Sequence, residues 1–390
     1  MAGETSEAPP TPGRWGVTGR LTLVMRDFSG GGAEKIMVNL ATGLLDRGHD
    51  VELVVIEKTG PYLDLAPSNL PIVELGGRRV STSVPALAHH LKQRRPDAVL
   101  SSLVHMNVAT VLARALGRVE TRLVVRQEAH LHGNPSPDAS MGTRLAYRLV
   151  PWAYRRADHV VGVSRGVVNE VRERTGLGPE RISTVYNPVL SEESVRRLTT
   201  LQPTPHPWLE PGAPPVVIAM GRLVPQKDYP TLLEGFARLR ISRPLRLIIL
   251  GEGPLRKDLT RQAVELGIGD EVHFAGFVED PLSWMKQARL FAHTARWEGF
   301  GNVLVEALAC GLPVVATDCP SGPREILDDG RYGRLVGVGD IDGLVEAIRK
   351  TLKETPDQED LRDRAREFTV EAILPAYEAL FGLSDADGSE

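Results

Sequence analysis

Short runs of apolar residues alternate with segments of helical periodicity along most of the chain, and this alternation restricts the fold more than any other feature. In the first half, strand-like runs occupy 51–56, 72–75 and 98–103, and a helical segment near 85–94 precedes the third. Strands that alternate with helices predict parallel sheets, with ligands bound at the carboxyl ends of the strands. The predicted fold class is therefore α/β.

The polar, proline-rich stretch 191–215 divides this alternating pattern into two parts. The 390 residues are enough for two domains, which we predict over 17–190 and 216–370 with 191–215 as their linker. A last amphipathic helix and a short tail make up 371–390. Residues 1–16, rich in Pro, Gly, Glu and Thr, are predicted to be a disordered tail without an apolar signal-peptide region.

Two glutamates eight residues apart, Glu298 and Glu306, enclose a glycine-containing loop and the start of a short helix. The first N–H groups of a helix have no intrahelical partner, so this backbone is predicted to hold a phosphate. The candidates for that contact are Gly299, Phe300, Gly301, Asn302 and Val303. An ionised carboxylate only accepts hydrogen bonds, which suits the vicinal hydroxyls of a sugar or a ribose. Phosphate and sugar hydroxyls together predict a nucleotide sugar.

This stretch resembles the E-x7-E signature of the family 4, or group 1, class of retaining glycosyltransferases. The resemblance implies a GT-B architecture, in which two Rossmann-like domains face a central cleft. It implies that Glu298 contacts the transferred sugar and Glu306 the ribose of the donor. It also implies that the C-terminal domain binds the donor, that the N-terminal domain binds the acceptor, and that the last helix crosses back to the N-terminal domain. The alternative is a loop and a core helix with two solvated acids.

Arg222 and Lys227 follow the predicted strand 216–220 and match the family motif G-R-L-x-x-x-K. At the carboxyl end of a strand, two cations can neutralise a pyrophosphate and stabilise a departing nucleoside diphosphate. We therefore assign both residues to donor binding and catalysis, together with Glu298. The alternative, two surface cations that open a helix, is disfavoured because positive charge is unfavourable at a helix N-terminus.

Further donor contacts are predicted in strand-to-helix turns. Gly31 and Gly32 lie in such a turn, without the fingerprint of a dinucleotide site or a P-loop. The resemblance brings this turn close to the donor phosphates, whereas a plain flexible turn is the alternative. It also places Gly251 beside the nucleotide and the backbone of Phe277 and Val278 beside the base.

His105, Glu128 and His130 follow predicted strands of the first domain and are the acceptor-side candidates. Many family members have a histidine that contacts the transferred sugar directly after the second of these strands. This chain has Arg126 and Gln127 there. We expect His130 to take part in catalysis instead, and a surface histidine without a role is the alternative.

The segment 144–156 combines basic and aromatic residues, a composition typical of helices that lie on anionic membranes. The residues expected to touch such a membrane are Arg144, Arg148, Trp152, Arg155 and Arg156. The first 190 residues also carry 23 basic and 18 acidic side chains. The alternative is an ordinary packing helix. Because no apolar run is long enough to span a bilayer, we expect a cytoplasmic protein, peripheral on the inner face of the cytoplasmic membrane where this helix binds it.

Composition argues against other partners and cofactors. The net charge of -4 gives no reason to expect a nucleic-acid partner. Two cysteines without a C-x-x-C pattern indicate neither a disulfide framework nor a zinc site. The D-x-D patterns at 340–342 and 385–387 are better explained as a helix cap and as tail. We expect no metal and no cofactor besides the nucleotide sugar itself.

The sequence thus predicts a retaining, metal-independent glycosyltransferase. It would move a hexose or N-acetylhexosamine from a nucleotide sugar, expected to be UDP-linked, to a hydroxyl of a glycan or lipid-linked acceptor in polysaccharide or glycoconjugate biosynthesis. Two alternatives stay open: an inactive nucleotide-sugar-binding or scaffolding subunit, and a sugar-nucleotide epimerase of the same fold.

Overall fold

The computed structural model describes residues 18–29, 31–77, 79–131, 140–198, 200–241, 244–354 and 357–383. The predicted N-terminal tail, 1–16, lies outside the described residues. The same holds for the last seven residues, 384–390, with the second D-x-D pattern.

The first domain is built on a seven-stranded sheet with the strand order β3-β2-β1-β4-β5-β6-β7, and all its paired strands are parallel. The strands are β1 (Arg20–Val24), β2 (Asp50–Val55), β3 (Ile72–Glu74), β4 (Ala98–Ser102), β5 (Arg122–Gln127), β6 (His159–Gly162) and β7 (Ile182–Thr184). The helices that follow them are α1 (Gly32–Asp46), α2 (Val80–Arg94), α3 (Val104–Gly117), α4 (Met141–Tyr154), α5 (Arg165–Thr175) and α6 (Glu192–Arg197). Helices cover both faces of the sheet, so residues on both sides of β4 are buried.

The second domain repeats this plan with a six-stranded parallel sheet of order β10-β9-β8-β11-β12-β13. Its strands are β8 (Val216–Met220), β9 (Arg246–Leu250), β10 (Val272–Gly276), β11 (Leu290–His293), β12 (Val314–Thr317) and β13 (Arg334–Val336). Its helices are α7 (Tyr229–Arg240), α8 (Arg256–Glu265), α9 (Pro281–Gln287), α10 (Asn302–Ala309), α11 (Pro323–Ile326), α12 (Ile341–Thr351) and α13 (Gln358–Arg366). The predicted cap at Asp340 is confirmed, since its side chain accepts a hydrogen bond from Gly343 N.

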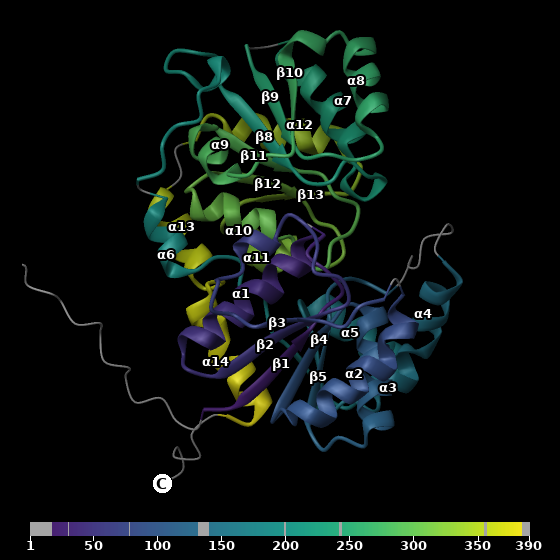
Figure 1. The fold of residues 1–390 in the computed structure, drawn as a ribbon. Coiled ribbons are helices and arrows are strands. Elements are labelled where there is room, and N and C mark those ends of the chain that lie inside the picture. The colour runs from purple at the N-terminus through teal and green to yellow at the C-terminus, as the bar shows by residue number, and fades with distance from the viewer. Residues whose placement is uncertain are drawn as a thin grey trace, which may run out of the picture.

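Two connections join the domains, and they run side by side. Val189 N donates to Phe368 O at 2.9 Å and Val370 N donates to Leu190 O at 2.8 Å. The range 191–215, which leads from the first connection to β8, contains the short helix α6. The second connection leads into α14 (Val370–Phe381), which lies against α1 and β5 of the first domain (Figure 1).

The predicted fold class, two Rossmann-like domains with parallel sheets flanked by helices, is confirmed. In each sheet the strand order reverses once, between β1 and β4 and between β8 and β11. Ligands of open α/β sheets bind at such switch points, outside the carboxyl ends of the strands. The segments that follow these four strands are therefore where a ligand site is expected.

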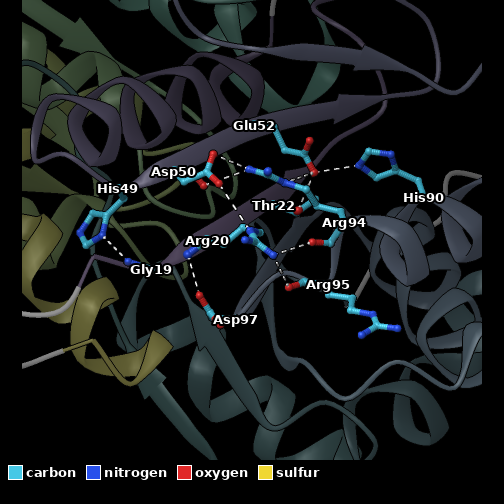
Figure 2. Close-up of polar contacts among 10 residues, drawn as sticks. All are labelled: Gly19, Arg20, Thr22, His49, Asp50, Glu52, His90, Arg94, Arg95 and Asp97. Atoms are coloured by element: carbon cyan, nitrogen blue, oxygen red, sulfur yellow. Dashed lines mark hydrogen bonds and ion pairs between the residues drawn. The ribbon is translucent and has the colours of Figure 1, made fainter.

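Inside the first domain, the buried Glu52 on β2 is held by three side chains, as Figure 2 shows. It accepts hydrogen bonds from Thr22 Oγ1 at 2.7 Å and His90 Nε2 at 2.8 Å, and Arg94 Nε lies 3.4 Å away. Burial alone would raise the pKa of Glu52, but the bonds from His90 and Thr22 and the charge of Arg94 lower it below the ordinary value. Asp50 on the same strand also pairs with Arg94, at 2.6 Å, but its side chain is 57% exposed.

We expect Glu52→Gln to lower the free energy of unfolding by about 2 kcal/mol, because it removes a buried charge-assisted contact. Asp50→Asn is the matched control and should cost about 1 kcal/mol or less, because it weakens an exposed ion pair. Urea unfolding followed by circular dichroism measures both. Since the folded-state pKa of Glu52 lies below 4.5, the difference from wild type should narrow as the pH falls below 4.5. Equal losses in the two variants would contradict this account.

Candidate active site

The two domains meet where the turn before α1 faces the start of α10 (Figure 1). A Cβ atom on Gly32 would lie 3.1 Å from Asn302 Nδ2, a tight contact. Asn187, which follows β7, donates from Nδ2 to Asn302 Oδ1 at 2.7 Å. The helix predicted to hold phosphate is thus in direct contact with the first domain. Gly31 is the N-cap of α1, and the φ of -84° needs no glycine.

Glu298 lies in the loop between β11 and α10 and is buried, with an exposed fraction of 7%. It forms an ion pair with Lys227 and accepts a hydrogen bond from His293 Nε2 at 3.0 Å. Burial would raise the pKa of Glu298, but the Lys227 ammonium and the His293 bond hold it at about 2. The carboxylate is therefore ionised throughout the neutral range and can only accept hydrogen bonds.

Glu306 lies on α10 and is 4% exposed. Its Oε1 accepts a hydrogen bond from Lys35 Nζ of α1, in the opposite domain, at 2.7 Å. The two predicted glutamates thus have the same arrangement: each is a buried carboxylate with one lysine as its partner. Lys227 comes from the same domain as its glutamate, and Lys35 comes from the other.

The N-terminus of α10 is open to an anion. No side chain caps it, and Gly301 before it has the left-handed φ of 103°. Leu304 N bonds to Gly301 O at 2.9 Å, so the N–H groups of Asn302 and Val303 have no intrahelical acceptor. The side chain of Phe300 instead packs in the core, 5.4 Å from the ring of Tyr186. Only its backbone can face a ligand.

Gly299 sits against the first domain without room for a side chain. A Cβ atom there would overlap with the carbonyl oxygen of Glu128. Glu128 itself accepts hydrogen bonds from Ser102 and from Arg126. The loop that carries Glu298 is thus packed directly against one of the acceptor-side candidates.

The remaining donor candidates lie at the ends of β8, β9 and β10. Arg222 is exposed and has no ion pair with any residue that the structure describes. Gly251 N donates to Gly276 O at 2.7 Å, and its φ of 124° and its contact with Gly221 both require glycine. Phe277 is 58% exposed, and Val278 is partly buried against the core.

His130 is fixed between the domains. Its Nδ1 lies 2.7 Å from Glu170 Oε2, and its Nε2 lies 2.7 Å from Ser321 Oγ. Ser321 in turn donates to the carbonyl oxygen of Glu298 at 2.8 Å. The predicted catalytic histidine is therefore connected to the Glu298 loop through one serine.

His105 lies in the first turn of α3. Its Nε2 is buried and has no hydrogen-bond partner within the described part of the chain. Burial, with a smaller effect of Arg26, lowers the pKa of His105 to about 4, so the ring is neutral. The preceding Leu103 has a φ of 74°, which is rare for a residue with a side chain and marks local strain at the end of β4.

Arg126 is a residue whose role the sequence did not reveal. It is fully buried, donates from Nε to Tyr377 Oη on α14 at 2.8 Å, and bonds to Glu128 and Asn187. Through Asn187 it reaches Asn302, so it connects the crossing helix with the start of α10. The sequence did contain one indication of this role, because Arg126 is a charged residue at the end of an apolar strand run. Such a residue is buried only when it has a partner.

Lys35 and His293 were also missed. His293 is the last residue of β11 and is buried. Burial disfavours the charged form of its ring and so lowers its pKa. Its Nδ1 has no hydrogen-bond partner among the described residues. A histidine that ends the apolar run 290–292 could have been noticed as a polar group at the carboxyl end of a strand.

Family models match both halves of the chain. The model for glycosyl transferases group 1 matches residues 204–368, and the model for glycosyltransferase family 4 matches residues 30–193. The lipopolysaccharide 1,6-galactosyltransferase of Escherichia coli K12 is 30% identical over 284 residues, 71% of this chain and 72% of that protein. This chain belongs to the group 1 glycosyltransferases.

Other relatives of this glycosyltransferase match over a longer range. An N-acetylgalactosamine-N,N'-diacetylbacillosaminyl-diphospho-undecaprenol 4-alpha-N-acetylgalactosaminyltransferase from Campylobacter jejuni is 26% identical, covering 89% of this chain and 94% of that protein. Among solved structures, Anabaena HepE in complex with UDP and glucose has a TM-score of 0.75 and 22% identity, over 93% of this chain and 99% of that one. The galactosyltransferase WaaB in its apo form has a TM-score of 0.71 and 20% identity, over the same shares. These structures have the GT-B fold, which confirms the predicted architecture.

In this glycosyltransferase, Gly299→Ala should keep the domains apart, because the added Cβ meets the backbone of Glu128 and not a side chain that can move. A displacement of about 1 Å can lower the rate roughly 100-fold, and we expect a loss of that order in sugar transfer. Small-angle X-ray scattering should show a larger radius of gyration. The control is Gly142→Ala, where the nearest atom would be 3.9 Å away. An unchanged radius and rate for Gly299→Ala would contradict the close approach.

Proposed function

We propose that this glycosyltransferase moves a hexose or N-acetylhexosamine from a UDP-sugar to a hydroxyl of a glycan or lipid-linked acceptor, with retention of configuration and without a metal ion. The observation that carries the proposal is the position of two buried, lysine-paired glutamates on either side of the uncapped N-terminus of α10. Such a site offers acceptors for sugar hydroxyls and donors for a diphosphate. Arg222, which follows β8, is exposed, so its charge is available to a bound diphosphate.

The comparisons support the donor and the pathway. One structural neighbour is a complex with UDP and glucose. The names of several relatives refer to lipopolysaccharide or to a diphospho-undecaprenol acceptor. For this chain we propose the same classes: a uridine diphosphate donor and a lipid-linked or polysaccharide acceptor, made and used at the cytoplasmic face of a membrane.

In the proposed reaction, the bond between the sugar C1 and the diphosphate oxygen breaks as the acceptor oxygen bonds to C1 from the same face. The acceptor proton passes to the departing phosphate. The negative charge that develops on the diphosphate is stabilised by the N-terminus of α10, Lys227 and Arg222, which need no reorganisation during the reaction. Glu298 holds the sugar hydroxyls. Its pairing with Lys227 makes it a poor nucleophile, which favours this route over a covalent intermediate.

In this proposal, side chains of the protein supply the positive charge that stabilises the departing diphosphate. Within the described ranges, no group of three or more His, Cys, Asp or Glu residues could hold a metal ion. Lys227, Arg222 and the helix N-terminus take the part that a divalent cation has in other transferases.

The outer face of α4 supports the proposed peripheral membrane contact. Met141 and Leu145 are 85% and 55% exposed, and they alternate along the helix with Arg144 and Arg148. Arg156 stacks 4.5 Å above the ring of Trp152 one turn later. None of the helices in the described part of the chain has the length and apolar character needed to cross a bilayer. We therefore propose that α4 lies on an anionic lipid surface.

Thermal unfolding with a panel of UDP-, GDP- and ADP-sugars in EDTA tests the donor. We expect one UDP-sugar to stabilise the wild type, by about 2.7 kcal/mol at a hundred times its dissociation constant. Glu306→Ala should lose this stabilisation relative to its own ligand-free melting temperature. If no nucleotide sugar stabilises the wild type, the scaffold alternative is favoured. Turnover of the donor without an acceptor, into another nucleotide sugar, would favour the epimerase.

Flotation with phosphatidylcholine vesicles that contain phosphatidylglycerol tests the membrane contact. Each basic residue near such a surface contributes about 1 kcal/mol, so Arg144→Gln with Arg148→Gln should weaken binding roughly 30-fold. Arg196→Gln with Arg197→Gln is the matched control, since it removes two exposed arginines from α6. Equal binding by the two double variants would contradict a role for α4.

A further inference from the structure

Lys35 enters the candidate donor site from the opposite domain. It lies in the first turn of α1, directly after the glycine turn, and its Nζ donates to Glu306 Oε1 at 2.7 Å. The two residues are separated by 271 positions in the sequence. The Lys35 side chain is 28% exposed and that of Glu306 is 5% exposed, so this pair is largely shielded from water.

Because the ion pair between Lys35 and Glu306 is buried, breaking it costs more free energy than breaking a surface ion pair. A buried carboxylate that loses its cation is strongly destabilised, because neither water nor another charge replaces the partner. The attraction of Glu306 raises the pKa of Lys35 and outweighs the opposite effect of burial. Lys35 therefore keeps its positive charge at neutral pH. Glu306 Oε2 makes no hydrogen bond to any residue that the structure describes, so it remains available to a ligand hydroxyl.

The charges of the site show what Lys35 contributes. A nucleoside diphosphate sugar brings two negative charges to a site that already contains the carboxylates of Glu298 and Glu306. Lys227 is paired with Glu298, so the diphosphate shares Lys227 with that carboxylate and otherwise depends on Arg222 and the partial charge of the α10 N-terminus. Without Lys35, the second carboxylate would stand unneutralised next to the bound anion.

We propose that Lys35 is a donor-binding residue supplied by the acceptor domain: it neutralises and orients Glu306 so that the carboxylate can take a ribose hydroxyl beside the diphosphate. This inference rests on the proposed function, since it assigns a role within the donor site. Because Lys35 and Glu306 lie on different domains, the pair also makes donor binding depend on domain closure. Donor affinity should then respond to a residue that lies outside the donor domain.

Isothermal titration with UDP tests this assignment in the full chain. Lys35→Met should weaken UDP binding about tenfold or more. Lys35→Arg should recover most of the affinity, because it keeps the charge. In a Glu306→Gln background, Lys35→Met should have an effect at least about fivefold smaller, since no buried carboxylate is left to neutralise. Lys58→Met removes an exposed lysine of the same domain and should leave the affinity unchanged.

The outcomes separate this inference from the proposed function. If the wild type binds UDP and Lys35→Met binds it equally well, the role of Lys35 is refuted and the proposed function stands. If Lys35→Met loses the same factor with and without Glu306, the pairing is refuted. If the wild type binds no uridine nucleotide, the proposed function fails first. Should Lys35→Met not fold, a loss of affinity in Lys35→Arg as large as that in a Lys35→Ala variant would equally overturn the inference.

Discussion

Two buried ion pairs between glutamate and lysine lie at the centre of the candidate site. Glu298 and Glu306 stand at the joint of the domains, where unpaired ions would be strongly unfavourable. Each is held by one lysine, and these lysines come from different domains. The pair between Lys35 and Glu306 adds a buried ionic contact to the other contacts between the domains. Because Lys35 lies on the first domain, Glu306 has its lysine partner only when that domain is in place.

The same joint explains the glycines around the site. Gly299 lies against the backbone of Glu128, and Gly322 has a φ of 89° and lies against the backbone of Phe300. Neither position has space for a Cβ atom. The backbone can therefore make these two close contacts only with glycine at both positions. In the segment that starts at Glu298, the helix N-terminus is therefore available to a ligand. The loop before it packs against the opposite domain.

Much of the fold could be predicted because strands buried on both faces appear as predominantly apolar runs, as in 51–56 and 98–103. β13 was missed because it has three residues, two of them only partly buried. Spacing and motif were sufficient to propose Glu298, Glu306, Arg222 and Lys227 as site candidates. The partners Lys35 and Arg126 could not be found in this way, because their roles come from tertiary contacts with residues 271 and 251 positions away.

Arg126 shows how this chain departs from its family on the acceptor side. Its guanidinium donates to Tyr377, Glu128 and Asn187 and is fully buried, so it has no exposed surface with which to contact a sugar. Arg126 instead holds Glu128 in place. The loop that carries Glu298 packs against the backbone of Glu128 at Gly299. His130 reaches the same loop from the other side through Ser321. The first domain thus acts on the position of Glu298 through two contacts. A histidine in place of Arg126 has too few hydrogen-bonding groups to make all three of these bonds, so at least one of Tyr377, Glu128 and Asn187 would lose its bond to this position.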